Sequence, residues 1–131
     1  MGIAQWLRWQ WEGYSRYHQS RANLVLHIFV VPLFLIGHVT LVAAFVRRGW
    51  LAACIALSAV LLSIALQGRG HRQEGVPPEP FTGPRNAISR IFLEQWITFP
   101  RFVLSGRWFK AMRHASASSS KPPHMPAKEK P

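Results

Sequence analysis

Two long apolar segments without any charged side chain constrain the fold of this chain more than any other feature. Residues 24–46 contain no Asp, Glu, Lys or Arg over 23 positions, and residues 50–66 contain none over 17 positions. As helices they would be roughly 34 Å and roughly 25 Å long, against a hydrocarbon core of about 30 Å. A soluble domain would interleave apolar and charged residues at helical or strand period. The segments therefore predict membrane spans; a buried helix of a soluble bundle is the alternative for the shorter one.

The segment between the two predicted spans is very short, so the spans should lie antiparallel as a hairpin. Three Lys or Arg residues precede the first span, two lie in the turn Arg47-Arg48-Gly49, and eleven follow the second span. This asymmetry predicts that both termini are cytoplasmic. The aromatic residues before the first span, such as Trp6, Trp9 and Trp11, do not suit the short basic region of a cleaved signal peptide.

The charge of the chain fits a membrane protein better than a nucleic-acid-binding one. The formal net charge is +11, from 16 basic and 5 acidic residues. A basic surface can bind nucleic acid, but the positive-inside bias and anionic lipid head groups explain the charge more simply. We therefore expect anionic lipids as partners and no nucleic acid. The single cysteine, Cys54, cannot form an intrachain disulfide.

Amphipathic patterns flank the predicted hairpin. Residues 3–20 repeat apolar and aromatic side chains at spacings of three and four, as in a helix at a membrane surface. Residues 67–85 are rich in Gly and Pro and predict a loop. Residues 86–112 return to helical period, with a first helix ending at Pro100 and Glu94 on its polar side. The charges there predict surface or re-entrant helices, not a third span.

The predicted fold class is thus all-α: an integral membrane helical hairpin with amphipathic surface or re-entrant helices before and after it. Its spans cover residues 23–46 and 50–66, within a single domain of residues 1–114. Residues 115–131 are small, polar or proline and predict a disordered tail.

Three histidines are the candidate metal ligands. His18 and His27 are nine residues apart and would lie on opposite faces of one continuous helix. They can share a metal only if the surface helix ends near Ser20 and the span starts afresh at Ala22 or Asn23. His71 follows the second span, and an antiparallel hairpin returns it to the membrane face of His27.

Two further positions belong to this predicted site. Glu74 lies three residues after His71, on the same side of a helical turn, and is a candidate ligand or support. Asn23 precedes His27 by one turn and could hydrogen-bond its ring. Imidazole and carboxylate donors with open positions suit non-haem Fe(II), although Zn²⁺ and Mn²⁺ use similar donors. The alternative is that the histidines serve packing or hydrogen bonds between helices.

His38 is expected to stand apart from this site. It lies on nearly the same face as His27 but about 16 Å further along the helix axis. That distance excludes a shared metal and also a bis-histidine haem ligated by the two residues. We expect His38 to make an interhelical hydrogen bond.

Three motifs occur in order along the chain. Residues 14–34 read YSRYHQSRANLVLHIFVVPLF, residues 67–74 read QGRGHRQE, and residues 94–108 read EQWITFPRFVLSGRW. Together they resemble the Mpo-like family, formerly a domain of unknown function, and the third is similar to a block of its bacterial branch. The resemblance covers about residues 10–110. Two features depart from the family pattern: Val30 replaces a frequent glycine, and His71 and Glu74 are three residues apart instead of four.

The resemblance implies a function. The characterised fungal member is a dioxygenase of the endoplasmic reticulum that uses Fe(II) and O₂ to shorten 2-hydroxy fatty acids by one carbon. Carried over to this sequence, the resemblance implies that the catalytic, iron-binding residues are His18, His27 and His71. The bacterial branch implies a bacterial cytoplasmic membrane rather than the endoplasmic reticulum.

The resemblance also implies supporting residues, and the sequence leaves an alternative function open. The implied supporting positions are Tyr14, Asn23 and Glu74. Arg69, Arg72 and Arg101 are candidates to hold the substrate carboxylate, with contacts to lipid phosphate as the alternative for each. The competing hypothesis for the whole protein is a non-catalytic membrane adaptor or lipid-binding protein.

Overall fold

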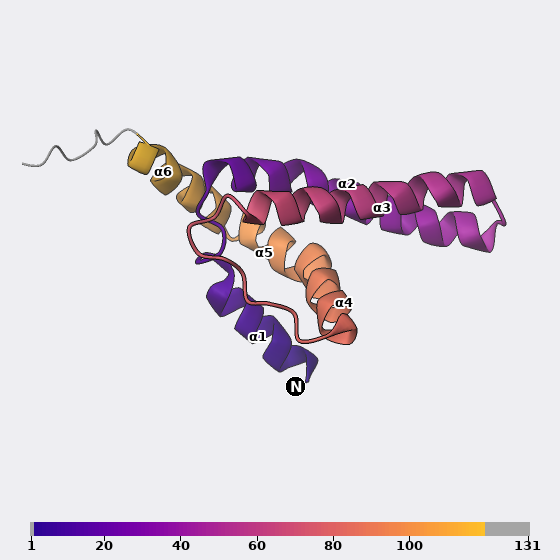
Figure 1. The fold of residues 1–131 in the computed structure, drawn as a ribbon, viewed down its shortest axis with the longest axis horizontal. Coiled ribbons are helices and arrows are strands. Elements are labelled where there is room, and N and C mark those ends of the chain that lie inside the picture. Colours follow the sequence, from indigo (N-terminus) through magenta and orange to yellow (C-terminus); the bar gives the residue numbers. More distant parts are fainter. Residues whose placement is uncertain (1, 120–131) are drawn as a thin grey trace, which may run out of the picture.

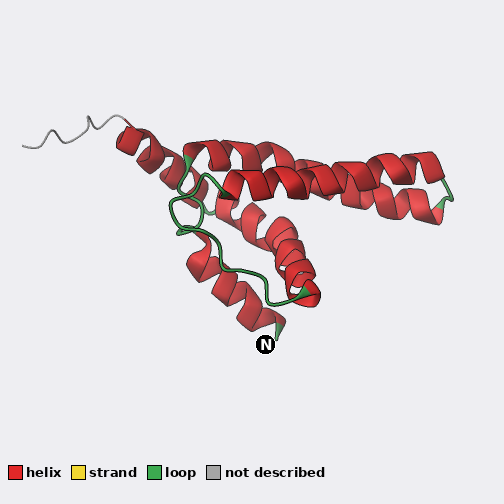
Figure 2. Ribbon diagram, in the orientation of Figure 1, coloured by secondary structure: helices red, strands yellow, loops and turns green. Residues whose placement is uncertain are grey.

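The computed structural model describes residues 2–119, and every regular element within that range is a helix. The elements in order are α1 (Ile3–Tyr14), α2 (Arg21–Val46), α3 (Trp50–His71), α4 (Pro84–Leu93), the π-helical turn η1 (Glu94–Thr98), α5 (Phe99–Leu104) and α6 (Arg107–Ser119) (Figure 1). The predicted all-α fold class is confirmed. One long loop, residues 72–83, joins α3 to α4, and Figure 2 shows it passing beside α1.

Helices α2 and α3 form the predicted antiparallel hairpin (Figure 1). The chain reverses at Arg48, which adopts a left-handed φ of 56°. A small residue allows close packing of the two helices at Gly37. A Cβ there would lie 3.1 Å from Cγ2 of Val60 and 3.3 Å from the carbonyl oxygen of Ala56. Such close approach at small residues is typical of helices that pack within a membrane.

Both hairpin helices have the length and composition to cross a membrane. Their most apolar stretches have mean hydropathies of 2.4 in α2 and 2.1 in α3, and only 28% and 22% of these stretches is buried. The core helix of a soluble bundle would be mostly buried. Large apolar side chains instead face outward along the hairpin, among them Phe29, Ile36, Phe45, Leu51, Ile55 and Leu62. An exposed apolar surface of this kind favours a lipid environment over a soluble bundle.

The remaining helices gather at the open end of the hairpin, where α2 begins and α3 ends (Figure 1). There α1 packs against α4 and η1, and α6 packs against α2. Trp108 of α6 donates a 3.1 Å hydrogen bond from Nε1 to the carbonyl oxygen of Leu24. A cluster of buried apolar side chains lies at this end, and consists of Tyr14, Leu24, Val31, Phe99 and Phe102.

Several boundaries differ from the sequence-based predictions. Helix α1 ends at Tyr14 instead of near residue 20, and α3 continues past residue 66 to His71. Helix α6 extends to Ser119, so residues 115–119 are helical and not part of a disordered tail. The rest of the predicted tail, residues 120–131, lies outside the described residues.

Pro100 does not end a helix, contrary to the prediction. The chain is helical from Pro84 to Leu104, and η1 immediately precedes the proline. Because proline has no N–H, the usual helical hydrogen bond at that position cannot form. The chain widens instead into a π turn, in which the N–H of Phe99 donates to the carbonyl oxygen of Glu94. Single π turns of this kind are frequent at functional sites.

Candidate metal centre

Three histidines and one glutamate converge at the open end of the hairpin. His18 lies between α1 and α2, His27 lies in α2, His71 ends α3, and Glu94 begins η1. One donor atom from each side chain lies within 4.8 Å of the donor atoms of the others. The three imidazole centroids are 4.8 to 5.1 Å apart. Since imidazole and carboxylate groups this close can surround one ion, the geometry defines a candidate metal centre.

The break between α1 and α2 brings His18 to His27. Helix α1 ends at Tyr14 and α2 starts at Arg21, with turn hydrogen bonds from Arg16 to Gly13 and from Tyr17 to Tyr14 between them. The two histidines therefore do not lie on one continuous helix. The geometric condition for a shared site is met, although the break starts earlier than predicted.

The two innermost histidines are held in one defined orientation. Nδ1 of His18 lies 2.9 Å from the carbonyl oxygen of Tyr14, and Nδ1 of His27 lies 2.9 Å from that of Asn23. A carbonyl oxygen only accepts hydrogen bonds, so each Nδ1 carries the proton and each Nε2 keeps its lone pair. This is the arrangement in which histidine ligates metals.

The free ring nitrogens are buried and have no hydrogen-bond partner. They are Nε2 of His18, Nε2 of His27 and Nδ1 of His71. His18 is 2% exposed and His27 is fully buried. Buried polar atoms are almost always satisfied, so three unsatisfied nitrogens that face one point call for a common partner. A metal ion fits them because a neutral imidazole can present a lone pair at each of these nitrogens.

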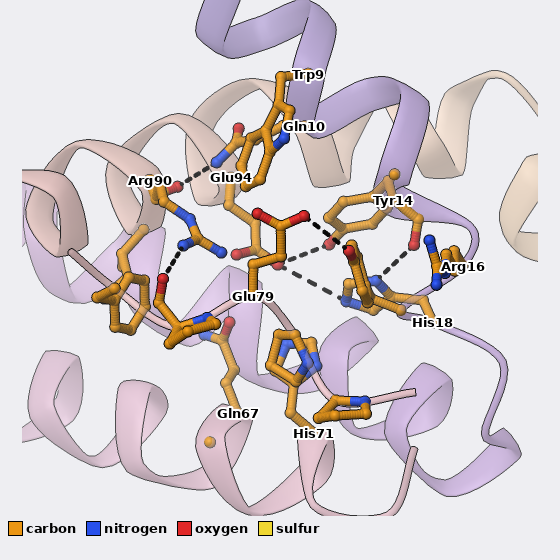
Figure 3. Close-up of a pocket in the computed structure, with 18 of the residues that line it drawn as sticks. Trp9, Gln10, Tyr14, Arg16, His18, Gln67, His71, Glu79, Arg90 and Glu94 are labelled. Atoms are coloured by element: carbon orange, nitrogen blue, oxygen red, sulfur yellow. Dashed lines mark hydrogen bonds and ion pairs between the residues drawn. The ribbon is translucent and has the colours of Figure 1, made fainter. Parts of the chain in front are cut away.

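Glu94 supplies the carboxylate of the cluster, and Tyr14 holds it. Figure 3 shows the phenol of Tyr14 and the ring of His18 beside Glu94. The hydroxyl of Tyr14 donates to Oε1 of Glu94 at 3.0 Å, and Nε2 of His18 lies 3.7 Å from the same oxygen. The Tyr14 ring also stacks on His18, with centroids 3.9 Å apart. Tyr14 therefore contacts two members of the donor cluster.

Burial favours the uncharged forms of these groups. It raises the pKa of Glu94 to about 7. Burial, followed by the neighbouring His27 and His71, lowers the pKa of His18 well below its usual value. The pKa of Tyr14 is raised by burial and by the adjacent Glu94. His18 is therefore a neutral imidazole at physiological pH, the form that binds metals.

Glu74, predicted as a ligand or a supporting residue, does not lie in the donor cluster. Its carboxylate accepts hydrogen bonds from the backbone N–H groups of Gln19 and Ser20, each at 2.9 Å. It also accepts one from Nδ2 of Asn23 at 2.6 Å. Glu74 thus caps the N-terminus of α2, where a negative charge is favourable. It supports the cluster through Asn23, whose carbonyl oxygen orients His27.

The sequence analysis missed Glu94, which it placed on the polar side of a surface helix. One signal was available: Glu94 is one of only five acidic residues in the chain, and it stands in the otherwise apolar or polar-uncharged run LEQWITF. A lone carboxylate in such a run is a candidate for a buried role.

A buried amide network fixes η1, which carries Glu94. Gln67 and Gln95 exchange two hydrogen bonds, of 3.0 and 2.6 Å. Gln67 also donates to Ser63. On the other side of η1, Thr98 donates to Oε1 of Gln10 at 2.9 Å. Helices α1 and α3 thereby hold η1 between them. None of these supports was predicted from the sequence.

The other residues singled out in the sequence lie away from the cluster. The ring of His38 makes edge contacts with Phe92 and Trp96, at centroid distances of 5.6 and 5.8 Å. No hydrogen bond of His38 is found among the described residues, in contrast to the expectation. Arg69 and Arg72 are exposed near the end of α3. The guanidinium of Arg101 lies 4.1 Å from the centroid of Trp11.

A cavity of about 600 Å³ adjoins the donor cluster (Figure 3). His18, His71 and Glu94 line it, while His27 does not. Its walls come from α1, α3, the α4–η1 segment and the loop of residues 72–83. The cluster is thus closed on the His27 side and open to a ligand on the other.

Fold and site together define an all-helical protein with two helices able to span a membrane and a histidine-rich candidate metal centre at the base of their hairpin. Comparison with known proteins adds no family to this description. No family model matches the chain, and no curated protein or solved structure is significantly similar to it. The resemblance to the Mpo-like family therefore stands on its three sequence motifs alone.

Proposed function

We propose that this protein is a membrane-bound, Fe(II)-dependent dioxygenase that shortens 2-hydroxy fatty acids by one carbon. The observation that carries the proposal is the set of three buried, unpartnered ring nitrogens of His18, His27 and His71, which face one point beside Glu94. The motif resemblance supplies the reaction and the substrate class.

The chain's own residues would hold the ion in a fixed, water-poor setting. Neutral imidazoles of His18, His27 and His71 would be ligands, with Glu94 as the carboxylate donor. Bound Fe(II) would supply the reactivity toward O₂ and a point of attachment for the carboxylate and hydroxyl oxygens of a 2-hydroxy acid. Tyr14 orients Glu94 by its hydrogen bond, and Asn23 orients His27. Rigid support of this kind keeps donors in place without reorganisation during a reaction.

The proposal also covers the location of the protein and its lipid partners. The hairpin would cross a bacterial cytoplasmic membrane with both termini in the cytoplasm. The basic residues near the metal centre would then face anionic lipid head groups. Arg101 and Arg107, both 4.1 Å from the centroid of Trp11, are suited to such contacts. The engagement of Arg101 with Trp11 favours this role over a substrate contact.

The test is a product assay with a defined metal. Detergent-purified protein is stripped of metal, loaded anaerobically with Fe(II), and mixed with a 2-hydroxy fatty acid in air. Mass spectrometry should find the product one carbon shorter, and the His71→Ala variant should form none. The His38→Ala variant is the matched control and should form product. Stoichiometric iron binding without product would reject the oxygenase and leave a metal-binding membrane protein. Absence of histidine-dependent metal binding would favour the non-catalytic adaptor.

A further inference from the structure

The cavity beside the metal centre has the size of a small-molecule site. Its volume of about 600 Å³ lies within the usual range of roughly 300–1,000 Å³ for ligand pockets. The donor cluster lies on one of its walls. A ligand in the cavity therefore reaches His18, His71 and Glu94 with one end, while its remainder lies between α1, α3 and the loop of residues 72–83.

The walls combine apolar and charged side chains. Apolar side chains line much of the cavity, among them Trp9, Ile64, Phe81 and Ile91. The charged residues Arg16, Arg72, Glu12 and Glu79 also line it, and the metal-ligating groups lie at one side. A ligand with a metal-binding head and an apolar body matches these walls.

Arg90 closes one wall and is not free to bind the ligand. Its guanidinium lies 4.8 Å from the centroid of Trp9 and 4.7 Å from that of Phe81. It also donates a 3.2 Å hydrogen bond to the carbonyl oxygen of Pro80. Figure 3 shows Arg90 beside Trp9 on the side of the cavity away from His18. Arg90 thus ties the loop of residues 72–83 to α1 and α4.

Gly68 keeps the α3 wall open. It lines the cavity, and a Cβ built on it meets no atom within 4 Å. A larger side chain at this position would therefore occupy cavity space without displacing packed atoms. Gly75 also has open space for a Cβ but does not line the cavity, which makes it a matched control.

We propose that this cavity binds the apolar body of a single-chain amphiphilic acid, and that the missing side chain of Gly68 sets how much chain it accepts. The acid head lies at His18, His71 and Glu94, and the chain extends along Gly68 and Ile64. The identity of the head group rests on the proposed function. The location of the chain rests on the cavity alone.

Photoaffinity labelling tests the location. The probe is a long-chain saturated fatty acid with a diazirine in its tail, applied to the detergent-purified full chain, and the labelled peptides are mapped by mass spectrometry. Label should concentrate in α1, around Ile64 and in the loop of residues 72–83, and an unlabelled fatty acid should displace it. Label spread along the outward face of the α2–α3 hairpin instead would overturn the proposal.

Matched variants test Gly68. Gly68→Leu should weaken competition by a long-chain acid about tenfold, equivalent to about 1.4 kcal/mol, and should weaken competition by a short-chain acid less. Gly75→Leu should change neither. Unchanged metal content of Gly68→Leu would show that the fold is intact. Equal competition curves for Gly68→Leu and the unmodified chain would reject the role of Gly68.

The outcomes separate this inference from the proposed function. Cavity labelling that depends on Gly68, found without product formation, would retain the binding site and reject the oxygenase. Product formation together with labelling that does not depend on Gly68 would retain the oxygenase and reject the role of Gly68.

Discussion

His18 and His27 each donate a hydrogen bond from Nδ1 to a backbone carbonyl oxygen. Their Nε2 atoms are buried and have no hydrogen-bond partner. A buried polar atom without a hydrogen bond costs about 1–3 kcal/mol. The structure tolerates this cost at three neighbouring nitrogens, the third being on His71. An ion that binds all three would recover that free energy and stabilise the folded state.

Single histidine substitutions should separate ligands from packing residues. His18→Ala, His27→Ala and His71→Ala should each lower metal affinity sharply, because each removes one lone-pair donor. His38→Ala is the control: it removes only edge contacts with Phe92 and Trp96. Elemental analysis after dialysis against a graded chelator gives the affinities. Full metal occupancy in the triple histidine variant would exclude this cluster as the metal centre.

The two carboxylates should respond differently to the same change. Glu94→Gln should remove a direct donor and most metal binding. Glu74→Gln should weaken affinity only about ten- to hundredfold, because it acts through Asn23. It should also lower the free energy of unfolding, since it weakens the cap of α2 by about 1 kcal/mol. Titration with metal and thermal unfolding measure the two effects. A greater loss of metal from Glu74→Gln than from Glu94→Gln would reverse the assignment.

Glu94 should also make the metal-free protein sensitive to pH. Its pKa rises from 4.5 to about 7 on folding. The folded state therefore holds a proton that the unfolded state has lost, and stability falls as pH rises from about 4.5 through about 7. His18, whose pKa is lowered, acts oppositely and costs stability as pH falls below its usual 6.5. Glu94→Gln removes only the first effect.

The comparison of thermal unfolding with and without Glu94→Gln isolates this effect. In chelator, the variant should be more stable than the unmodified chain at pH 8, by about 3 kcal/mol at most, and the gap should close below about pH 4.5. A gap that stays constant with pH would show that Glu94 does not titrate in this range. Added metal should reverse the difference, because it binds and stabilises the unmodified chain while Glu94→Gln has lost a donor.

At the scale of the helices, Gly70 permits the close approach of α2 and α3 at the metal centre. A Cβ on Gly70 would collide with Oδ1 of Asn23 and lie 2.8 Å from Cδ2 of Leu26. Gly70→Ala should therefore lower the free energy of unfolding by about 1–3 kcal/mol, and displace Asn23 from His27. Gly68→Ala, two residues earlier on the same helix, meets nothing within 4 Å and is the control. The unfolding temperature and the metal affinity should both fall for Gly70→Ala and not for Gly68→Ala. Equal values for the two variants would contradict the close contact at Gly70.

For the whole molecule, the hairpin predicts which surfaces share a side of the membrane. Single cysteines at Ser15 and Ser105 should react with a membrane-impermeant reagent from the cytoplasmic side, and one at Gly49 from the opposite side. The native Cys54 is exposed and must first be replaced by serine. Labelling of all three positions from one side would exclude a spanning hairpin.

The sequence by itself determined the hairpin and the return of His71 toward His27, while the helix break that brings in His18 came from the structure. Uncharged apolar runs specify helices that need lipid or a core, and the short turn at Arg48 makes them antiparallel. Topology alone then returns His71 to the level of His27. The hairpin and the position of His71 depend on local composition and chain connectivity, and both can be read from the sequence.

Only the tertiary structure decided the fourth member of the cluster. Glu94 and Glu74 are both acidic residues near the base of the hairpin, and spacing favoured Glu74 because it follows His71 by one turn. The π turn before Pro100 and the amides of Gln67 and Gln95 instead carry Glu94 inward. Glu74 instead accepts hydrogen bonds from backbone N–H groups at the N-terminus of α2. Which carboxylate is buried depends on contacts between distant segments, and helical periodicity contains no information about them.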